Sequence, residues 1–222
     1  MFIVDTQVTR RGPKRSLTSD QIVDTALDLL DLAEPPSIRG VAARLGVRPN
    51  TLYTYFPDRA ALERAIIDRL LGLADPALLT GRRSWRRRIE DFACALREVL
   101  LRRPRAVGLF FTAPMDGPAA GLVGERLLEA FTTAGLPPED ASRAGYAVMV
   151  QVLGSVALAV ADLPPGGGRE ADLVAERRGR LSLIDPSLLP LTAGTVDIAA
   201  TWNTETQFRW QLRALLDGCA PR

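Results

Sequence analysis

The chain has 222 residues, 47% of them hydrophobic and 24% charged, which is enough apolar mass for a folded core and excludes disorder as the main state. Its 28 basic and 26 acidic residues give a net charge of +2, which excludes a histone-like polycation. The chain has no histidine, which excludes histidine-ligated metal centres and serine–histidine–aspartate triads. Two cysteines cannot form a disulfide framework, and residues 1–15 have no apolar core of signal-peptide length, so we expect a cytoplasmic protein.

Two helices are predicted between residues 18 and 45. Apolar residues recur at steps of three and four along residues 18–33, which is the pattern of an amphipathic helix, and two prolines follow it. Ser37 is a suitable N-cap for a second helix that extends to about Leu45. Gly46 suits the left-handed conformation that ends a helix, so we expect the second helix to stop there.

A third helix is predicted over residues 49–56, because Pro49 suits the first helical position and Pro57 prevents continuation. The second and third helices are each about two turns long and are joined by a short turn with a glycine, which is the helix-turn-helix signature. Asp58 can cap a longer fourth helix, residues 59–73, that leads out of this motif.

The rest of the chain is also predicted to be helical. Helices are expected over residues 84–102, 104–112, 118–134, 137–163, 171–184 and 196–216, with a loop over residues 186–194. We find no segment with the two-residue alternation of a strand, so the predicted fold class is all-α. The expected organisation is a flexible basic arm (1–17), a three-helix helix-turn-helix domain (18–60, with its linking helix to about 74) and a C-terminal helical domain (75–222).

Residues 144–161 form an uncharged run of 18 residues, which is the lower length limit for a membrane span. The run is rich in alanine and glycine, carries Gln151 and Ser155, and stands alone in the chain. A buried helix in a soluble bundle has the same composition. We therefore favour a buried core helix or a subunit interface over a membrane span, and predict no membrane partner.

The segments LTSDQIVDTALDLL (residues 17–30) and SIRGVAARLGVRPNTLYTYFPDRAAL (residues 37–62) together resemble the DNA-binding domain of the tetracycline-repressor (TetR) family. The residues that carry this resemblance are Ala26, Ala42, Leu45, Gly46, Val47, Thr51, Leu52, Tyr53, Phe56 and Leu62. Residues 207–218 are similar, more weakly, to the last helix of the branch that contains the tetracycline repressor itself. The resemblance implies a ligand-responsive transcriptional regulator, usually a repressor that a small molecule releases from a palindromic operator. It also implies that the C-terminal domain binds that effector and forms a homodimer.

The outward face of the third predicted helix carries groups suited to double-stranded DNA. Leu52 and Phe56 lie four residues apart and face the core, which leaves polar residues outside. Asparagine can pair with adenine, a threonine methyl can contact thymine, and tyrosine hydroxyls hold phosphates, while four positive charges between residues 10 and 15 suit a minor-groove or backbone arm. By resemblance, Arg39 contacts a base or a phosphate, and Arg59 holds a phosphate. The candidate DNA-binding residues are therefore Arg10, Arg11, Lys14, Arg15, Arg39, Arg48, Pro49, Asn50, Thr51, Tyr53, Thr54, Tyr55 and Arg59.

Several of these residues have a purely structural alternative. The basic arm can be a solvated tail, and Asn50 and Thr51 can be capping residues of the third helix. A second basic run, RRSWRRR at residues 82–88, is interpreted as a solvated helix start or an interface rim rather than as another nucleic-acid site.

The resemblance places the effector and dimer sites in the C-terminal domain. An effector pocket is expected to be apolar with a few polar groups, and our candidates are Phe92, Leu96, Phe110, Phe111, Met115, Tyr146, Met149 and Gln151. The dimer candidates lie on the uncharged helix and the last helix: Gly154, Ala157, Leu158, Ala161, Phe208, Leu212 and Leu215. We predict no metal and no cofactor. The tetracycline repressor reaches its metal-bound drug with imidazole, so the missing histidine disfavours a magnesium–tetracycline ligand here.

An enzyme is disfavoured because the chain carries neither a phosphate-binding GxxxxGK[ST] motif nor a GxSxG nucleophile elbow. The alternative that stays open is a helical adaptor whose helix-turn-helix binds protein without sequence-specific DNA binding. Salt dependence distinguishes the two, because DNA binding weakens steeply as the salt concentration rises.

Overall fold

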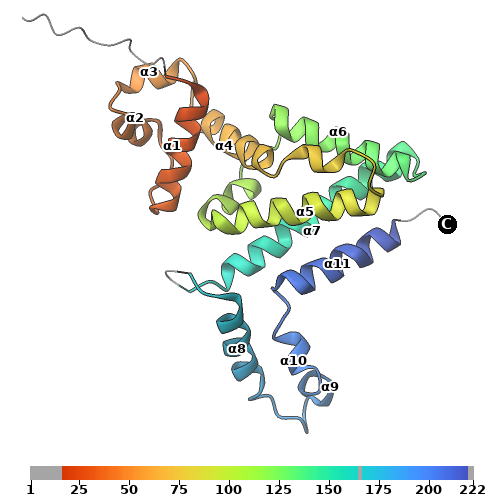
Figure 1. Cartoon of the computed structure of the whole chain (residues 1–222). Coiled ribbons are helices and arrows are strands. Elements are labelled where there is room, and N and C mark those ends of the chain that lie inside the picture. Colours follow the sequence, from red (N-terminus) through yellow and green to blue (C-terminus); the bar gives the residue numbers. More distant parts are fainter. Residues whose placement is uncertain (1–16, 165–166, 220–222) are drawn as a thin grey trace, which may run out of the picture.

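The computed structural model of the chain describes residues 17–164 and 167–219. Over these residues it contains helices and no strand, which confirms the all-α class. Figure 1 shows a small N-terminal lobe of three helices, a helix that leads out of it, and a larger helical bundle with a projecting arm. The basic residues Arg10, Arg11, Lys14 and Arg15 lie outside the described residues.

The first helix, α1 (Ser19–Asp31), begins with a reciprocal capping box. The Thr18 hydroxyl accepts the backbone N–H of Gln21 at 3.2 Å, and the Gln21 side chain accepts the backbone N–H of Thr18 at 3.1 Å. Two N–H groups that the helix itself leaves unpaired are thereby satisfied. The start of the N-terminal lobe is thus defined by local sequence.

The helix-turn-helix consists of α2 (Ile38–Leu45) and α3 (Pro49–Tyr53). Gly46 ends α2 in the left-handed conformation with φ of 67°, as the sequence predicted. The third helix is three residues shorter than predicted. Residues 54 and 55 form a turn and Phe56 has no regular structure; Pro57 disfavours the helical conformation at Phe56 alone, so the helix ends before the proline requires it.

A single apolar core joins the three helices of the lobe to α4 (Arg59–Leu73), the linking helix that the sequence predicted. Its fully buried members come from all four helices and include Ile22, Ala26, Val41, Ala42, Leu52 and Leu62. Leu52 is the buried residue of α3, and burying a leucine side chain contributes about 1.5–3 kcal/mol. The burial of Leu52 holds α3 against the lobe, where α3 contacts α2.

The C-terminal bundle is built around α7 (Pro138–Ala161), which packs against helices on several sides. Its partners are α5 (Trp85–Arg102), α6 (Pro118–Thr133), α11 (Glu205–Gly218) and the 3-10 segment η2 (Pro104–Phe111); a second 3-10 segment, η1 (Pro76–Leu79), follows α4. Within the described residues, α7 alone has the length and hydropathy of a membrane span. One face of α7, including Val148, Val152 and Val156, is buried in the bundle core, and this face covers 33% of the apolar window.

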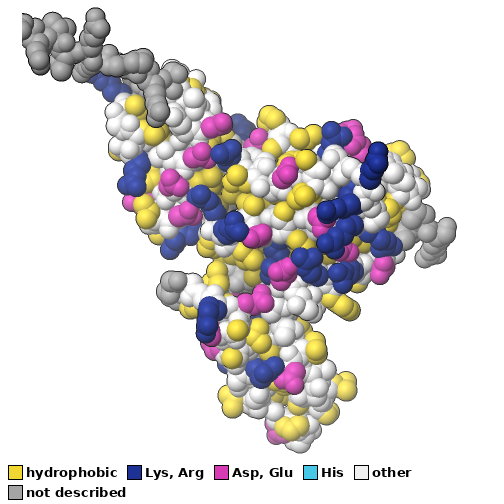
Figure 2. Space-filling model, viewed as in Figure 1, with side chains coloured by type: hydrophobic (Ala, Val, Ile, Leu, Met, Phe, Trp, Pro, Cys, Tyr) yellow, Lys and Arg dark blue, Asp and Glu magenta, His cyan; other side chains and the backbone are white. Residues whose placement is uncertain are grey.

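Between α7 and α11 the chain forms a projecting arm, visible below the bundle in Figure 1. The arm contains α8 (Glu170–Leu181), α9 (Pro190–Ala193) and α10 (Val196–Ala199). No residue of α8 is buried. Figure 2 shows hydrophobic side chains at the surface of the arm, where Leu183 and Leu191 are 86% and 85% exposed.

The arm corrects two expectations from the sequence. The helix predicted over residues 196–216 is divided, because the Thr204 hydroxyl accepts the backbone N–H of Gln207 at 3.3 Å and so caps a new helix. The loop predicted over residues 186–194 contains the four-residue α9. Thr204 lies inside a segment whose apolar residues have helical spacing throughout. The spacing therefore predicted one helix and gave no sign of the N-cap that divides it.

Candidate DNA-binding surface and effector cavity

The outer face of α3 presents polar side chains to solvent. Asn50, Thr51 and Tyr53 are exposed, whereas Leu52 is fully buried beneath them. The N-cap position of α3 is Arg48, and its side chain makes no capping hydrogen bond. Asn50 and Thr51 therefore do not occupy the capping position that the structural alternative required.

Three of the DNA-binding candidates interact with their own protomer. The Tyr55 hydroxyl donates a hydrogen bond to the Leu17 carbonyl oxygen at 2.6 Å, which fixes the start of α1 against the end of the helix-turn-helix. The Thr54 hydroxyl donates to the Thr51 carbonyl at 2.7 Å, and Arg59 pairs with Glu63 at 2.7 Å. Tyr55 thus has a positioning role that the sequence analysis missed, because its partner lies 38 residues away.

The remaining candidates of this surface, Arg39, Arg48 and Pro49, are exposed. Three of the four acidic residues of α1 pair with arginines outside the helix-turn-helix: Asp24 with Arg69 of α4 at 3.0 Å, and Asp28 and Asp31 with Arg103 at 3.6 and 2.6 Å. These ion pairs partly neutralise the negative charge of α1. They also connect the N-terminal lobe to α4 and the bundle.

The linking helix is joined to the bundle by Asp68. Its Oδ1 accepts the backbone N–H of Ala119 at 2.8 Å and that of Ala120 at 3.0 Å, in the first turn of α6. A carboxylate at this position satisfies two N–H groups without a helical partner and interacts favourably with the helix dipole. Asp68 therefore joins α4 to the N-terminus of α6 through a charged contact.

Three of the eight effector candidates line one cavity. Met115, Tyr146 and Met149 surround a space of about 220 Å³ between α6 and α7, which Leu71 of α4 also lines. Helix α6 contacts both α4 and α7, and Figure 1 shows α4 ending beside α6 in the upper part of the bundle. A mostly apolar cavity next to the linking helix has the composition expected of a small-molecule site.

The other five effector candidates lie elsewhere. Phe92 and Leu96 are completely buried and Phe110 is nearly so, and all three belong to the hydrophobic core. Phe111 is 60% exposed, and Gln151 donates a side-chain hydrogen bond to Gln211 of α11 at 3.0 Å. Residues of the core and residues of a cavity wall both recur at helical spacing along an apolar face. The spacing therefore could not distinguish these core residues from a cavity lining.

The structure divides the dimer candidates into two groups. Phe208 and Leu212 are 1% and 0% exposed inside the protomer, so their assignment to a dimer surface is wrong: they pack α11 onto the bundle. Leu158 and Ala161 are exposed, and Gly154, Ala157 and Leu215 are partly buried. Trp210, on the opposite face of α11, is 65% exposed and was missed, although its offset from the buried positions could have identified it.

The basic run at residues 82–88 is largely engaged within the protomer. Arg83 and Arg87 pair with Asp91, Arg86 pairs with Asp217 at 2.6 Å and Arg88 donates to a backbone carbonyl. These contacts agree with a structural interpretation of the run. Among the described residues, no group of three or more cysteine, aspartate or glutamate side chains is arranged to hold a metal ion.

Comparisons with known proteins match this architecture. A family model described as the C-terminal domain of tetracyclin-repressor-like proteins matches residues 76–222. An HTH-type transcriptional regulator from Saccharopolyspora erythraea is 35% identical over 145 residues, which are 64% of this chain and 61% of that protein. A second curated relative is covered over 47% of its length. The chain thus spans about half to three fifths of the length of these relatives.

Solved structures extend the likeness to both parts of the chain. A protein described as a possible TetR family transcriptional regulator from Streptomyces coelicolor is 30% identical, with a TM-score of 0.73 over 90% of this chain and 98% of that one. ActR of Streptomyces coelicolor, solved with actinorhodin, shares the fold at 20% identity, with a TM-score of 0.77 over 92% and 97% of the two chains. The fold and these matches define an all-α protein of the helix-turn-helix regulator class. The chain belongs to the tetracycline-repressor family.

Proposed function

We propose that the chain is a homodimeric, cytoplasmic transcriptional repressor that a small molecule releases from a palindromic DNA operator. The observation that carries this proposal is α3, which one buried leucine seats on the lobe while Asn50, Thr51 and Tyr53 face solvent. Asparagine and threonine distinguish bases in the major groove. Tyrosine and arginine hold phosphates and fix the register of the protein on the duplex.

The proposed contacts divide by chemistry. Asn50 and Thr51 read base edges, and Tyr53, Arg39 and Arg48 hold phosphates, since all five are exposed. Pro49 sets the start of the helix, and Tyr55 and Thr54 keep its end in place. Arg59 leaves Glu63 for a phosphate, and the arm that carries Arg10, Arg11, Lys14 and Arg15 follows the backbone or minor groove.

Dimerisation is proposed through the exposed faces of α7 and α11. Leu158 and Trp210 are 62% and 65% exposed, and a Cβ added at Gly154 would have no atom within 4 Å, so a partner helix has space to approach. A two-fold dimer presents two copies of α3 about 34–36 Å apart, one turn of DNA, which is why the operator should be a palindrome.

The cavity between α6 and α7 is the proposed effector site. An occupant that enlarges it moves α6, and Asp68 passes that movement to α4 and so to the spacing of the two copies of α3. ActR, solved with actinorhodin, is a precedent within the same fold for a bound small molecule. Repression rather than activation is proposed from the family.

The test is DNA binding by fluorescence anisotropy, using an operator enriched from genomic fragments of the source organism. Asn50→Ala should weaken operator binding by about 1–3 kcal/mol and relax the preference at one base pair. Arg48→Ala should weaken binding to all sequences about equally and reduce the salt slope by about 1. Arg44→Ala is the matched control, because Arg44 is exposed on α2 but is not a proposed contact.

Equal loss in the Asn50 and Arg44 variants would show that α3 does not read the bases. Binding that is insensitive to both salt and sequence would favour the protein-binding adaptor instead.

A further inference from the structure

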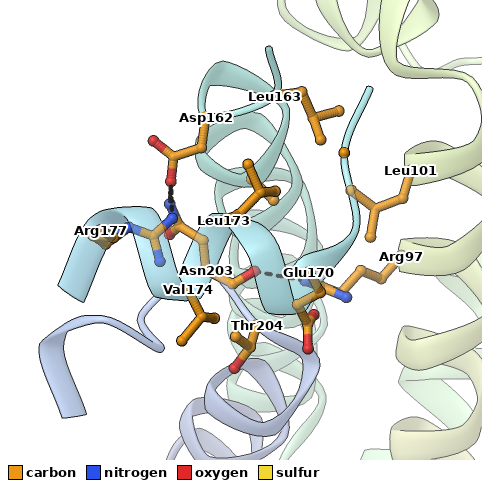
Figure 3. A pocket seen from close by; sticks show the side chains of 12 residues that line it. Arg97, Leu101, Asp162, Leu163, Glu170, Leu173, Val174, Arg177, Asn203 and Thr204 are labelled. Atoms are coloured by element: carbon orange, nitrogen blue, oxygen red, sulfur yellow. Dashed lines mark hydrogen bonds and ion pairs between the residues drawn. The ribbon is translucent and has the colours of Figure 1, made fainter. Parts of the chain in front are cut away.

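A second cavity, of about 200 Å³, lies where α8 meets the bundle, and the proposed repressor mechanism does not use it. Figure 3 shows its walls, which come from α5, α7, α8 and the turn before α11. Leu101, Leu163, Leu173 and Val174 make most of the lining apolar. An apolar cavity of about 150 Å³ holds benzene, so this one has room for a ring compound.

One wall of this cavity carries a buried cation. Arg97 of α5 is only 6% exposed, and in Figure 3 it extends from α5 toward Asn203. Its Nη2 donates a hydrogen bond to the Asn203 carbonyl at 3.0 Å, whereas its Nε is buried and has no hydrogen-bond partner among the described residues. An arginine side chain stays protonated and has five N–H donors, so a buried one is costly unless an anion or several acceptors face it.

Among the described residues no carboxylate forms an ion pair with Arg97, although Glu170 and Glu205 lie close enough for their charges to act on it. Arg177 and Asp162, which line the same cavity, form an ion pair with each other, and Arg177 also donates to the Ala200 carbonyl at 2.6 Å. Cζ of Arg97 lies 5.4 Å from the centre of the Phe208 ring, a cation–π contact that compensates only part of the lost hydration. Burial lowers the pKa of Arg97, although the charge of Glu170 partly opposes this.

Glu170 lines the cavity too, but it is engaged elsewhere. It is exposed at the start of α8, and its carboxylate accepts the backbone N–H of Glu205 at 3.2 Å. Its negative charge nevertheless repels an anion in the cavity. Removing that charge should therefore strengthen the binding of an anion.

The helix that closes the cavity is held to the rest of the chain by polar contacts of Arg177 and Glu170 and has no buried residue. Leu173 and Val174 of α8 are only partly buried beside the cavity. A ring compound in this space would remove both side chains from water and attach α8 to the bundle.

We propose that this cavity binds a small organic anion, an aromatic carboxylate whose carboxylate pairs with the Arg97 guanidinium while its ring lies against Leu101, Leu163 and Leu173. Arg97 lines the cavity, so the carboxylate supplies its guanidinium with a charged partner, and the apolar walls hold the ring. This cavity shares no lining residue with the cavity between α6 and α7. A measurement of ligand binding here therefore tests this proposal separately from the proposed repressor function.

The experiment is calorimetric titration of the full chain with 2-naphthoate and with 2-naphthamide, a neutral probe of nearly the same shape. The carboxylate should bind at least about tenfold more tightly, because charge-assisted hydrogen bonds are roughly twice as strong as neutral ones. Arg97→Gln should lower the affinity for 2-naphthoate to that for 2-naphthamide. Glu170→Gln should tighten the binding of naphthoate and leave that of naphthamide unchanged.

Two further readouts keep the test decisive if Arg97→Gln does not fold. Leu173→Trp puts a larger side chain of α8 into the cavity and should abolish the binding of both probes. Leu183→Trp lies at the exposed surface of the arm and should leave both affinities unchanged. Hydrogen exchange of α8 should slow when naphthoate is bound. Equal affinity for the two probes, no binding of naphthoate, or wild-type binding in Leu173→Trp would overturn the proposal.

Discussion

Asp68 is the carboxylate through which the linking helix contacts the first turn of α6, so its removal tests the coupling directly. It accepts two backbone N–H groups, those of Ala119 at 2.8 Å and Ala120 at 3.0 Å. Losing an N-cap interaction costs about 0.5–2 kcal/mol, and losing a negative charge at a helix N-terminus costs about 0.3–1 kcal/mol. Asp68→Ala should therefore lower the free energy of unfolding by about 2 kcal/mol.

Thermal unfolding and hydrogen exchange measure this effect. A chain of this size loses about 2–4 °C in Tm per kcal/mol, so Asp68→Ala should unfold about 4–8 °C below the wild type. Asp68→Asn keeps an oxygen acceptor and loses only the charge, so its Tm should lie between the two. The amides of Ala119 and Ala120 should exchange faster in Asp68→Ala, while those of α1 keep their protection. Wild-type exchange at these two amides would refute the reasoning.

Three further predictions follow from burial and packing. Leu158→Asp places a charge on the exposed face of α7 and should convert the proposed dimer to a folded monomer, measured by light scattering. Gly117→Ala should lower the Tm about as much as Asp68→Ala, because a Cβ at this position overlaps the Asp68 carboxylate, whereas Gly121→Ala at an open position should not. Burial raises the pKa of the Cys94 thiol, so alkylation at pH 8 should be slower in the folded chain than after unfolding. Because the unfolded thiol ionises first, the stability of the fold should fall as the pH rises above about 9.

Each of these has an outcome that contradicts it. A Leu158→Asp protein with unchanged mass would remove α7 from the proposed interface. A Gly117→Ala protein as stable as the wild type would mean that Asp68 has space to move. Equal alkylation rates for folded and unfolded Cys94 would show that the thiol is not shielded.

The helix-turn-helix could be predicted because its determinants are local. The Ser37 hydroxyl accepts the backbone N–H of Gly40 and begins α2, Gly46 ends α2 in the left-handed conformation, and Pro49 begins α3. The end of α3 was predicted less well, since the turn before Pro57 begins earlier than the proline itself requires. Local signals locate helices to within a turn.

The candidate sites in the bundle could not be separated from its core in the same way. Phe92 and Tyr146 are both apolar residues of long helices, yet the first is fully buried and the second is 70% exposed beside a cavity. Likewise Phe208 packs inside the protomer while Trp210 points outward. These differences depend on which faces of the helices meet in three dimensions, and periodicity reports only that a face is apolar. The buried cation Arg97 lies in an arginine-rich chain where composition gives no signal of burial.

The central claim is that two copies of α3 read a palindrome, and selection of genomic DNA tests it most directly. Purified protein would be incubated with fragments of the source genome, washed at moderate salt, and the retained DNA sequenced. The account predicts enrichment of a short palindrome whose half-sites are about one helical turn apart, and loss of that enrichment in Asn50→Ala. A folded protein that enriches no sequence, or one without two-fold symmetry, would contradict the account.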